Sequence, residues 1–368
     1  MRKPKIIILG KLPPPFMGPA IATEIILKSK LNDSFELIHL DTKINDSIAT
    51  MGRLSLKKMT KNFLLYVKMF YLLLRHWPSL VLIPISQSKG GYLKDAIYIF
   101  LSKLVGRKII LHLRGSAFRD LYESSSPSFQ RLVRMTMNMS SGVIVLGKKL
   151  KPIFKDLIPE EQIFVVPNGG NYNLPEREPM KENVVRLLYL SNLMKEKGVT
   201  DVLKATVLLK KNEIPFTMNL AGAWLNQETK TECEALIKDN NLPVILYPPQ
   251  DKKGKFELMT KADIFLFPPR SPEGHPWVLV ESMACGLPII ATDQGAIIES
   301  VIDGENGYIL PIESPELIFE KLKYLITNSD AREKMSKASR KLYEAGFTED
   351  KMVENLERVF NKIIKNER

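Results

Sequence analysis

The sequence predicts an α/β fold made of two Rossmann-like domains, each a doubly wound parallel sheet. Three observations lead to this prediction. Short apolar runs alternate with helical stretches, the alternation stops at a polar segment and restarts after it, and 368 residues exceed what one ordinary domain contains. Parallel strands need long crossover connections, usually helices, so strand and helix signals that alternate favour parallel sheets.

The first half of the chain contains six apolar, β-branched runs that are bounded by turn residues, as expected for buried strands. They cover residues 5–9, 35–40, 80–85, 108–113, 142–146 and 163–166, and helices are expected at 21–31, 54–77 and 93–105. Residues 171–183 are polar, contain prolines and show no periodicity, so they are interpreted as an interdomain linker.

The alternation then restarts. Strands are expected at 185–190, 216–221, 244–246, 264–268 and 288–291, and helices at 277–285, 313–345 and 349–364. The predicted domains are residues 1–175, joined by the terminal helix 349–368, and residues 184–345. Ligands of such sheets bind at the carboxyl ends of the strands, so chemistry is expected in a cleft between the two domains.

Composition narrows the class of protein. Hydrophobic residues make up 45% of the chain and charged residues 26%, as in a globular protein. No run of 18 apolar residues is present, and the basic, briefly apolar start is interpreted as a strand and not a signal peptide. Cys233 and Cys285 form no disulfide framework or metal-ligand spacing, so a reducing, cytoplasmic setting is expected.

The segment 265–311 carries the clearest functional signal. A strand is followed by a turn-rich loop with Glu273, and then by a helix that begins near Trp277 and carries Glu281. A helix N-terminus offers backbone N–H groups and a positive dipole end to phosphate. Carboxylates accept hydrogen bonds from vicinal hydroxyls, so two of them eight positions apart suit the two sugar rings of a nucleotide sugar.

This segment resembles the signature of the family-4 retaining glycosyltransferases of GT-B fold. The pattern is Glu, seven residues, Glu, a helix end of small residues, Gly-x-Pro and an Asn-Gly loop. The positions that match it are Glu273, Glu281, Gly286, Pro288, Gly295, Asn306 and Gly307. The resemblance covers nearly the whole chain and is strongest over residues 185–311.

The resemblance implies roles for these residues. Glu281 would hold the ribose hydroxyls of the nucleotide, and Glu273 would contact the transferred sugar. The backbone that follows Glu273 would hold the sugar and the phosphates, through Gly274, His275, Pro276, Trp277, Val278 and Leu279. Trp277 falls where the family is variable, so its side chain is given no special role.

A second donor element is expected at residues 188–199. It resembles the family segment whose Arg and Lys neutralise the diphosphate. Lys197 matches the lysine, but Asn192 stands where most members have the arginine, and Lys195 lies two residues before Lys197. Lys195 is therefore either a partial replacement for the arginine or a solvated turn residue.

The first half contributes fewer candidates. Gly18 matches the first of two glycines in the family's first strand-loop, which brings backbone close to the donor phosphate. His112 and Arg114 lie near Gly115, where the family has a cleft-lining residue, and the choice between the two stays open. No paired Asp motif is present, so the resemblance implies transfer without a metal or other cofactor.

The predicted function is therefore retaining transfer of a sugar from a nucleoside-diphosphate sugar to a saccharide or lipid-linked acceptor, in cell-surface polysaccharide synthesis. One alternative is a nucleotide-sugar 2-epimerase of the same architecture, which would release free nucleoside diphosphate without an acceptor product. A basic nucleic-acid-binding protein is the other, but the chain lacks a helix-turn-helix, RNP or zinc pattern, so no nucleic-acid partner is expected.

Charge is unevenly distributed. Residues 1–185 contain 28 Lys and Arg against 14 Asp and Glu, although the net charge of the whole chain is +12. No acidic residue occurs between Asp46 and Asp95, and residues 53–75 combine basic side chains with the apolar run 63–74. That segment is either a packed helix with solvated ends or a helix that lies on an anionic membrane surface, peripheral to the inner face.

Overall fold

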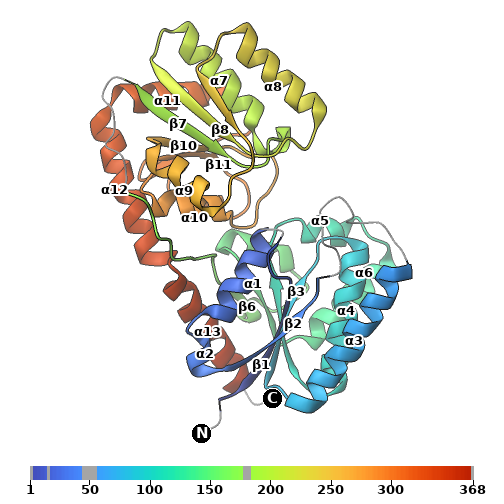
Figure 1. Cartoon of the computed structure of the whole chain (residues 1–368). Coiled ribbons are helices and arrows are strands. Elements are labelled where there is room, and N and C mark those ends of the chain that lie inside the picture. Colours follow the sequence, from blue (N-terminus) through green and yellow to red (C-terminus); the bar gives the residue numbers. More distant parts are fainter. Residues whose placement is uncertain (1–2, 15–16, 44–55, 177–183, 366–368) are drawn as a thin grey trace. The chain divides into compact units, whose positions relative to one another are not determined.

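A computed structural model of the chain describes residues 3–14, 17–43, 56–176 and 184–365. Two compact units make up the chain: Met1–Gly169 together with Glu349–Arg368, and Gly170–Thr348. Each unit contains a six-stranded parallel sheet (Figure 1). The predicted α/β class, with two doubly wound parallel sheets, is confirmed.

The sheet of the first unit has the strand order β2-β1-β3-β4-β5-β6, and all neighbouring pairs are parallel. Its strands are β1 (Lys5–Gly10), β2 (Glu36–Asp41), β3 (Leu80–Ile85), β4 (Lys108–Leu113), β5 (Gly142–Val145) and β6 (Ile163–Val165). The direction of winding reverses between β1 and β3. In an open α/β sheet, the crevice for ligands forms at the carboxyl ends of the strands that flank this reversal.

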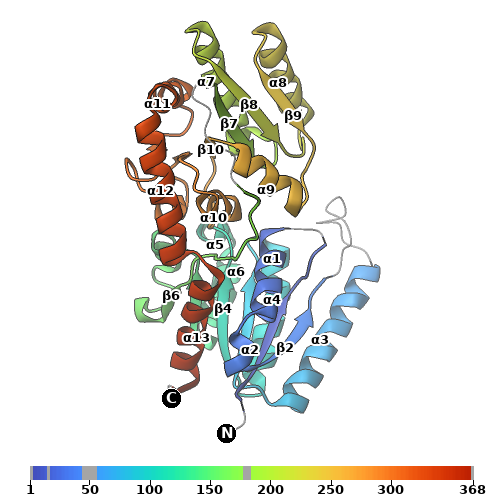
Figure 2. The same ribbon diagram turned by 60° about the vertical axis from the view of Figure 1, so that its left-hand side comes forward.

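Helices cover both faces of this sheet (Figures 1 and 2). On one face lie α1 (Gly18–Lys28), α2 (Leu31–Ser34) and α13 (Glu349–Lys365); on the other lie α3 (Leu56–His76), α4 (Lys89–Leu104) and α6 (Pro127–Met139), with α5 (Phe118–Glu123) after β4. The terminal helix α13 packs into this unit through Phe360, whose ring meets that of Phe35 edge-on at 5.8 Å.

The sheet of the second unit has the order β12-β11-β10-β7-β8-β9. Its strands are β7 (Val185–Leu190), β8 (Phe216–Ala221), β9 (Val244–Tyr247), β10 (Ile264–Phe267), β11 (Ile289–Thr292) and β12 (Gly307–Leu310). This is the strand order of dinucleotide-binding sheets, in which the winding reverses between the first strand, here β7, and the fourth, here β10.

Alternation along β7 explains why this sheet is buried on both faces. Val185, Leu187 and Tyr189 belong to one hydrophobic cluster, whereas Leu188 between them belongs to the other. Successive strand residues point to opposite faces, so a strand covered on both sides must be apolar throughout. The covering helices are α7 (Val199–Lys211), α8 (Gln227–Asp239) and α11 (Pro315–Thr327) on one face, and α9 (Lys252–Lys261), α10 (Trp277–Ala284) and α12 (Ser329–Gly346) on the other.

Some elements differ from the sequence prediction. Strand β12 was not predicted, because its four residues begin with Gly307 of an Asn-Gly pair, which is typical of a turn. The single helix expected at 313–345 is two helices, since the side chain of Asn328 accepts a hydrogen bond from Ala331 N at 3.0 Å and caps the second. Of the predicted linker, residues 177–183 lie outside the described residues.

Candidate active site

Two loops of the second unit leave the carboxyl ends of β7 and β10, where the winding reverses. The first loop contains the 3₁₀ turn Lys195–Lys197 and ends at Gly198. Gly198 has a φ of +78°, and a Cβ atom built on it would lie 1.9 Å from the carbonyl oxygen of Pro268 in the second loop. Only glycine permits this approach, so the two loops are held backbone against backbone.

Arg270 fastens the same two loops together. Its backbone N–H donates to the carbonyl of Glu196 at 2.9 Å, and its guanidinium holds both carboxylate oxygens of Asp201 at 2.6 and 2.8 Å. The guanidinium also contacts Glu313. Bidentate arginine–carboxylate pairs fix orientation as well as distance. The start of α7 and the loop after β10 are therefore tied into one rigid element.

This arrangement brings together two of the predicted site residues. The Lys197 ammonium forms an ion pair with Oε1 of Glu273, although the two residues are 76 positions apart. The hydroxyl of Tyr189 donates to the Lys197 carbonyl at 2.9 Å and steadies the turn. By contrast, Asn192 and Lys195 are exposed on the same loop.

The position of Glu273 depends on a second glycine. Gly295 has a φ of +64°, and a Cβ atom there would lie 1.6 Å from the carbonyl oxygen of Glu273. The next residue, Ala296, donates its backbone N–H to the carbonyl of Gly274 at 3.0 Å. The loop that carries Glu273 is thus seated on the turn after β11.

Helix α10 begins beside this loop. Pro276 is its N-cap residue and supplies no side-chain cap. His275, just before it, is buried; its Nε2 lies 2.5 Å from Ser300 Oγ, and its ring stacks on Phe347 at 5.3 Å. Burial lowers the pKa of His275 to about 4, so the ring is neutral at physiological pH. Its side chain is therefore a packing element, and only the backbone here is available to a ligand.

Glu281 lies on α10 and is buried, with 5% of its surface exposed. Its carboxylate forms an ion pair with the Lys255 ammonium from α9. Burial raises the pKa of Glu281, and the nearby charges of Lys255 and Lys252 oppose that rise. Sequence reasoning missed Lys255, because nothing in the α9 sequence separates it from the neighbouring surface lysines.

In the first unit, the carboxyl end of β4 lies close to the start of α1. Nη1 of Arg114 donates to the Pro19 carbonyl and, at 2.8 Å, to Thr23 Oγ1. Gly18 is the first residue of α1, directly before Pro19. Burial lowers the pKa of Arg114 to about 10, which leaves the guanidinium charged at neutral pH.

His112 lies beside Arg114. It is buried, and its Nδ1 lies 3.4 Å from the donating Nε of Arg114. Burial and the Arg114 charge lower the pKa of His112 well below its usual value, so the ring is neutral and its Nε2 carries the hydrogen. That N–H has no partner among the residues that the structure describes. A buried donor without a partner is costly, as expected where a ligand is bound.

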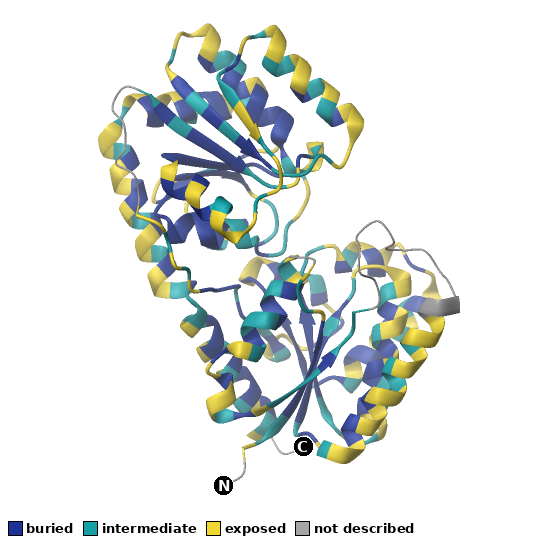
Figure 3. Ribbon diagram, viewed as in Figure 1, coloured by how far each residue is buried: buried dark blue, intermediate teal, exposed yellow. Residues whose placement is uncertain are grey.

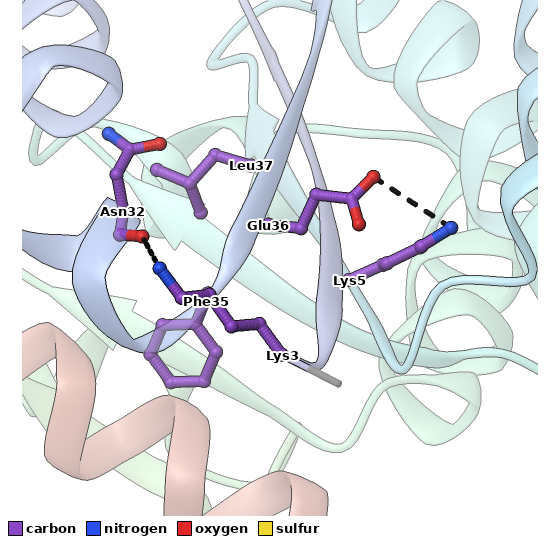
Figure 4. A pocket seen from close by; sticks show the side chains of 6 residues that line it. All are labelled: Lys3, Lys5, Asn32, Phe35, Glu36 and Leu37. Atoms are coloured by element: carbon purple, nitrogen blue, oxygen red, sulfur yellow. Dashed lines mark hydrogen bonds and ion pairs between the residues drawn. The ribbon is translucent and has the colours of Figure 1, made fainter. Parts of the chain in front are cut away.

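A different surface hollow, of about 580 Å³, lies at the amino ends of β1 and β2 (Figure 4). Lys3 donates to the Asn32 carbonyl at 2.7 Å, and Lys5 pairs with Glu36 at 3.7 Å, so its polar groups already have partners. It is at the wrong end of the strands for a ligand crevice. Among the described residues, no group of three His, Cys, Asp or Glu side chains is placed to hold a metal ion.

Comparison with known families shows what the second unit is similar to. Residues 173–342 match the family described as glycosyl transferases group 1. The match covers less than half of the chain. The matched region contains Lys197, Glu273 and Glu281 together with both loops that carry them.

The chain is also similar to several proteins of known name, one of which is named a glycosyltransferase. The chain is 23% identical to the Staphylococcus aureus capsular polysaccharide biosynthesis glycosyltransferase CapM, over 63% of this chain and 64% of that protein. It is 25% identical to the Bacillus anthracis N-acetyl-alpha-D-glucosaminyl L-malate synthase, over 74% and 73%. The match to Bacillus subtilis spore coat protein SA covers 48% of that relative. The chain therefore spans less than two thirds of the length of both CapM and spore coat protein SA.

Solved structures share the fold of both units. The Anabaena protein HepE, in complex with UDP and glucose, superposes with a TM-score of 0.71 at 18% identity, over 98% of this chain and all of that one. The sucrose-phosphate synthase of Thermosynechococcus elongatus gives 0.74 at 14% identity, over 98% and 99%. The fold of the chain is GT-B.

Removing the lysine of the Lys255–Glu281 ion pair should make the stability of the second unit depend on pH. In a Lys255→Met variant, burial should raise the pKa of Glu281 further. A carboxyl group whose pKa is higher in the folded than in the unfolded state favours folding while it is protonated, below about pH 4, and loses that contribution as pH rises through the folded-state pKa. We expect the variant to lose ~3–5 kcal/mol of unfolding free energy at pH 8 and much less at pH 4.5.

Urea unfolding at the two pH values measures this difference. Lys253→Met, an exposed change on the same helix, is the matched control and should lose little at either pH. Adding Glu281→Gln to Lys255→Met should remove the pH dependence. An equal loss at both pH values would show that Lys255 stabilises the domain by packing alone.

Proposed function

We propose that this protein transfers a sugar from a nucleoside-diphosphate sugar to a saccharide or lipid-linked saccharide, with retention of configuration, in the synthesis of a cell-surface polysaccharide. The observation that carries the proposal is the pair of partly or fully buried glutamates on either side of the α10 N-terminus, each held by a lysine from another element. Two carboxylates and a helix start near the reversal point of the sheet are the groups that we expect a nucleotide-sugar donor to need.

The two glutamates serve different parts of the donor. Glu281, held by Lys255, accepts hydrogen bonds from the ribose hydroxyls. Glu273, held by Lys197 on a loop seated against Gly295, accepts hydrogen bonds from hydroxyls of the transferred sugar. The diphosphate between the sugars lies at the N-terminus of α10, where backbone N–H groups from Gly274 onward hold it.

Lys197 links recognition to chemistry. An ammonium group has three donors, so it can contact both Glu273 and a phosphate oxygen. During transfer, the bond between the sugar C1 and the diphosphate oxygen breaks and negative charge grows on the phosphate, where Lys197 and the helix dipole stabilise it. The acceptor hydroxyl bonds to C1 from the same face, and its proton passes to the leaving phosphate.

The first unit supplies the acceptor side in this proposal. His112 is neutral and presents an Nε2–H donor that has no partner among the described residues. Arg114 is charged and held against the start of α1, where Gly18 stands. A neutral donor and a cation beside each other suit a sugar hydroxyl and an anionic group.

The named ligands and products of similar proteins support this class of donor and acceptor. The HepE structures are described with UDP and with UDP-glucose. One relative is named lipopolysaccharide 1,2-N-acetylglucosaminetransferase, from Salmonella typhimurium. A UDP-sugar is therefore the first donor to test, by thermal shift against GDP- and ADP-sugars, because a ligand at 100 times its dissociation constant adds about 2.7 kcal/mol.

Separate roles for the glutamates predict separate binding defects. Glu281→Ala should weaken binding of the bare nucleoside diphosphate by about 10- to 100-fold, since a hydrogen bond to a charged group contributes ~1.5–3 kcal/mol. Glu273→Ala should weaken the nucleotide sugar more than the diphosphate. Calorimetric titration of both ligands measures this, with the exposed Glu305→Ala as control. Identical losses for both ligands in both variants would refute the division.

The lysines of the first loop predict graded losses of rate. Lys197→Ala should abolish measurable transfer, because losing one preorganised donor at a developing charge costs on the order of 10²–10³ in kcat. Lys195→Ala should give an intermediate rate, since it partly replaces the arginine absent at Asn192. Product formation is compared with Lys210→Ala, an exposed lysine on α7. A wild-type rate for Lys195→Ala rejects the compensation, and an active Lys197→Ala enzyme rejects the donor site.

The proposal requires no divalent metal, since protein cations and the α10 N-terminus neutralise the leaving diphosphate. Turnover should therefore be unchanged after dialysis against EDTA. Activity that falls on EDTA treatment and returns with Mg²⁺ or Mn²⁺ would contradict this part of the proposal and leave the binding roles of the glutamates standing.

A further inference from the structure

Helix α3 of the first unit packs its sheet with one side and leaves large apolar side chains exposed on the other. Met69, Leu72 and Leu73 are buried beneath it. Tyr66 packs edge-on against Tyr98 of the neighbouring helix α4, with ring centres 5.0 Å apart. These residues, with their intermediate neighbours, occupy one side of the helix and satisfy its packing against the unit.

The opposite side is also apolar. At 100° per residue, it carries a stripe whose members lie within about 80° of the direction that points straight away from Met69. We call this stripe the outer face of α3. It consists of Phe63 (65% exposed), Leu64 (64%), Val67 (51%), Phe70 (38%), Tyr71 (55%) and Leu74 (52%), and Figure 3 shows the exposed residues along this helix.

Such an apolar surface is unusual on a protein whose surface contacts solvent alone. Single exposed apolar residues are normal, but a contiguous patch of large ones marks an interaction site. Trp77, which directly follows α3, is also 59% exposed, and its ring lies 3.9 Å from the Arg107 guanidinium. Because α3 already packs its inner side, the outer face is available to a partner outside this unit.

The basic residues of α3 show what kind of partner fits. Lys61, Lys68 and Arg75 are exposed and seven positions apart, so they form a single line along one flank of the outer face. Helix α3 contains no acidic residue. An apolar stripe beside a line of cations matches the acyl chains and anionic headgroups at a bilayer surface.

We propose that α3 lies along an anionic membrane surface, with its outer face among the acyl chains and its basic line at the headgroups. A second copy of the chain fits less well, because this helix would bring no carboxylate to pair with the cations of its partner. The helix lies on the surface and does not cross it: in the described part of the chain, no helix is long and apolar enough to span a membrane.

Two of the eight basic residues between Asp46 and Asp95, Lys57 and Lys58, belong to α3, but their side chains lie outside the described residues, as does Arg53. The proposal therefore rests on Lys61, Lys68 and Arg75 alone. Each basic residue near an anionic surface contributes a similar amount to the free energy of membrane binding. Three of them together strengthen partitioning into the membrane on the order of 100-fold.

The test is flotation of the full chain with phosphatidylglycerol vesicles and with phosphatidylcholine vesicles, without donor or acceptor. We expect binding to the anionic vesicles that weakens as salt is raised. Replacing Lys61, Lys68 and Arg75 by Gln should weaken it about 100-fold, and Phe63→Gln with Leu64→Gln should abolish it. The matched controls are Lys210, Lys211 and Lys238→Gln, three exposed lysines of the second unit, and Leu225→Gln, an exposed leucine; both should bind as the wild type.

Several results would overturn the proposal. These are absence of binding to either vesicle at low salt, equal binding to both vesicles, and wild-type binding by the charge or apolar variants. Sedimentation that shows a dimer in solution, lost in Phe63→Gln with Leu64→Gln, would assign the face to a second copy. All substitutions are on exposed positions, and circular dichroism confirms folding. The assay uses no sugar donor, so its failure leaves the proposed transfer untouched, and failure of that transfer leaves this result untouched.

Discussion

The close approach of Gly198 to Pro268 is the constraint on which the donor region depends. Two loops that leave neighbouring strands can be joined only where one of them has no side chain, and the carbonyl of Pro268 occupies the space that a Cβ atom would need. Arg270 then secures the contact through Asp201 and the Glu196 carbonyl. As a result, Lys197 and Glu273 form their ion pair on two loops whose backbones are fixed against each other. The proposed function needs such rigidity, because a group that stabilises a transition state must be held in place.

A second feature is the buried carboxylate of Glu281, which is paired with the Lys255 ammonium. Burial raises the pKa of Glu281, which by itself would favour the protonated form, and Lys255 opposes that rise. In the proposed function, Glu281 accepts two hydroxyl hydrogen bonds and must therefore be ionised, and the lysine from α9 favours that ionised form. The Lys255–Glu281 pair is costly to bury, and replacing such a pair with apolar residues often stabilises a protein. In the proposed function, the pair lowers the stability of the protein but allows the donor to be recognised.

Support for the donor loop extends well beyond the residues that would touch a ligand. His275 is neutral and packed between Ser300 and Phe347. The carbonyl of Ser300 accepts from the amide of Asn306 at 3.0 Å, and the other end of that amide accepts from Ile302 N at 2.8 Å. The loop with Asn306 thus fixes the turn at Ser300, and Ser300 in turn contacts His275 at the start of α10. Several positions that matched the family signature are therefore structural, and their role is to place the backbone of α10.

The sequence by itself determined the class of fold and most elements, because apolar strands buried on both faces leave a local pattern that ends sharply at turn residues. It also singled out the two glutamates and Lys197 as candidates, because each belongs to a short local sequence pattern. It missed β12, a strand of four residues that starts with the glycine of Asn306-Gly307 and contains two partly buried residues, Tyr308 and Ile309.

Strand order, the partners of Glu273 and Glu281, and the surroundings of His112 were decided only by the tertiary structure. The apolar pattern of β7 says that it is buried but not that β10 lies beside it, so the contact of Lys197 with Glu273 has no local signature. Lys255 is one of four lysines in the ten residues of α9, and only packing against α10 distinguishes it from the exposed ones. Long-range contacts depend on how elements pack, and that information is spread over the whole chain.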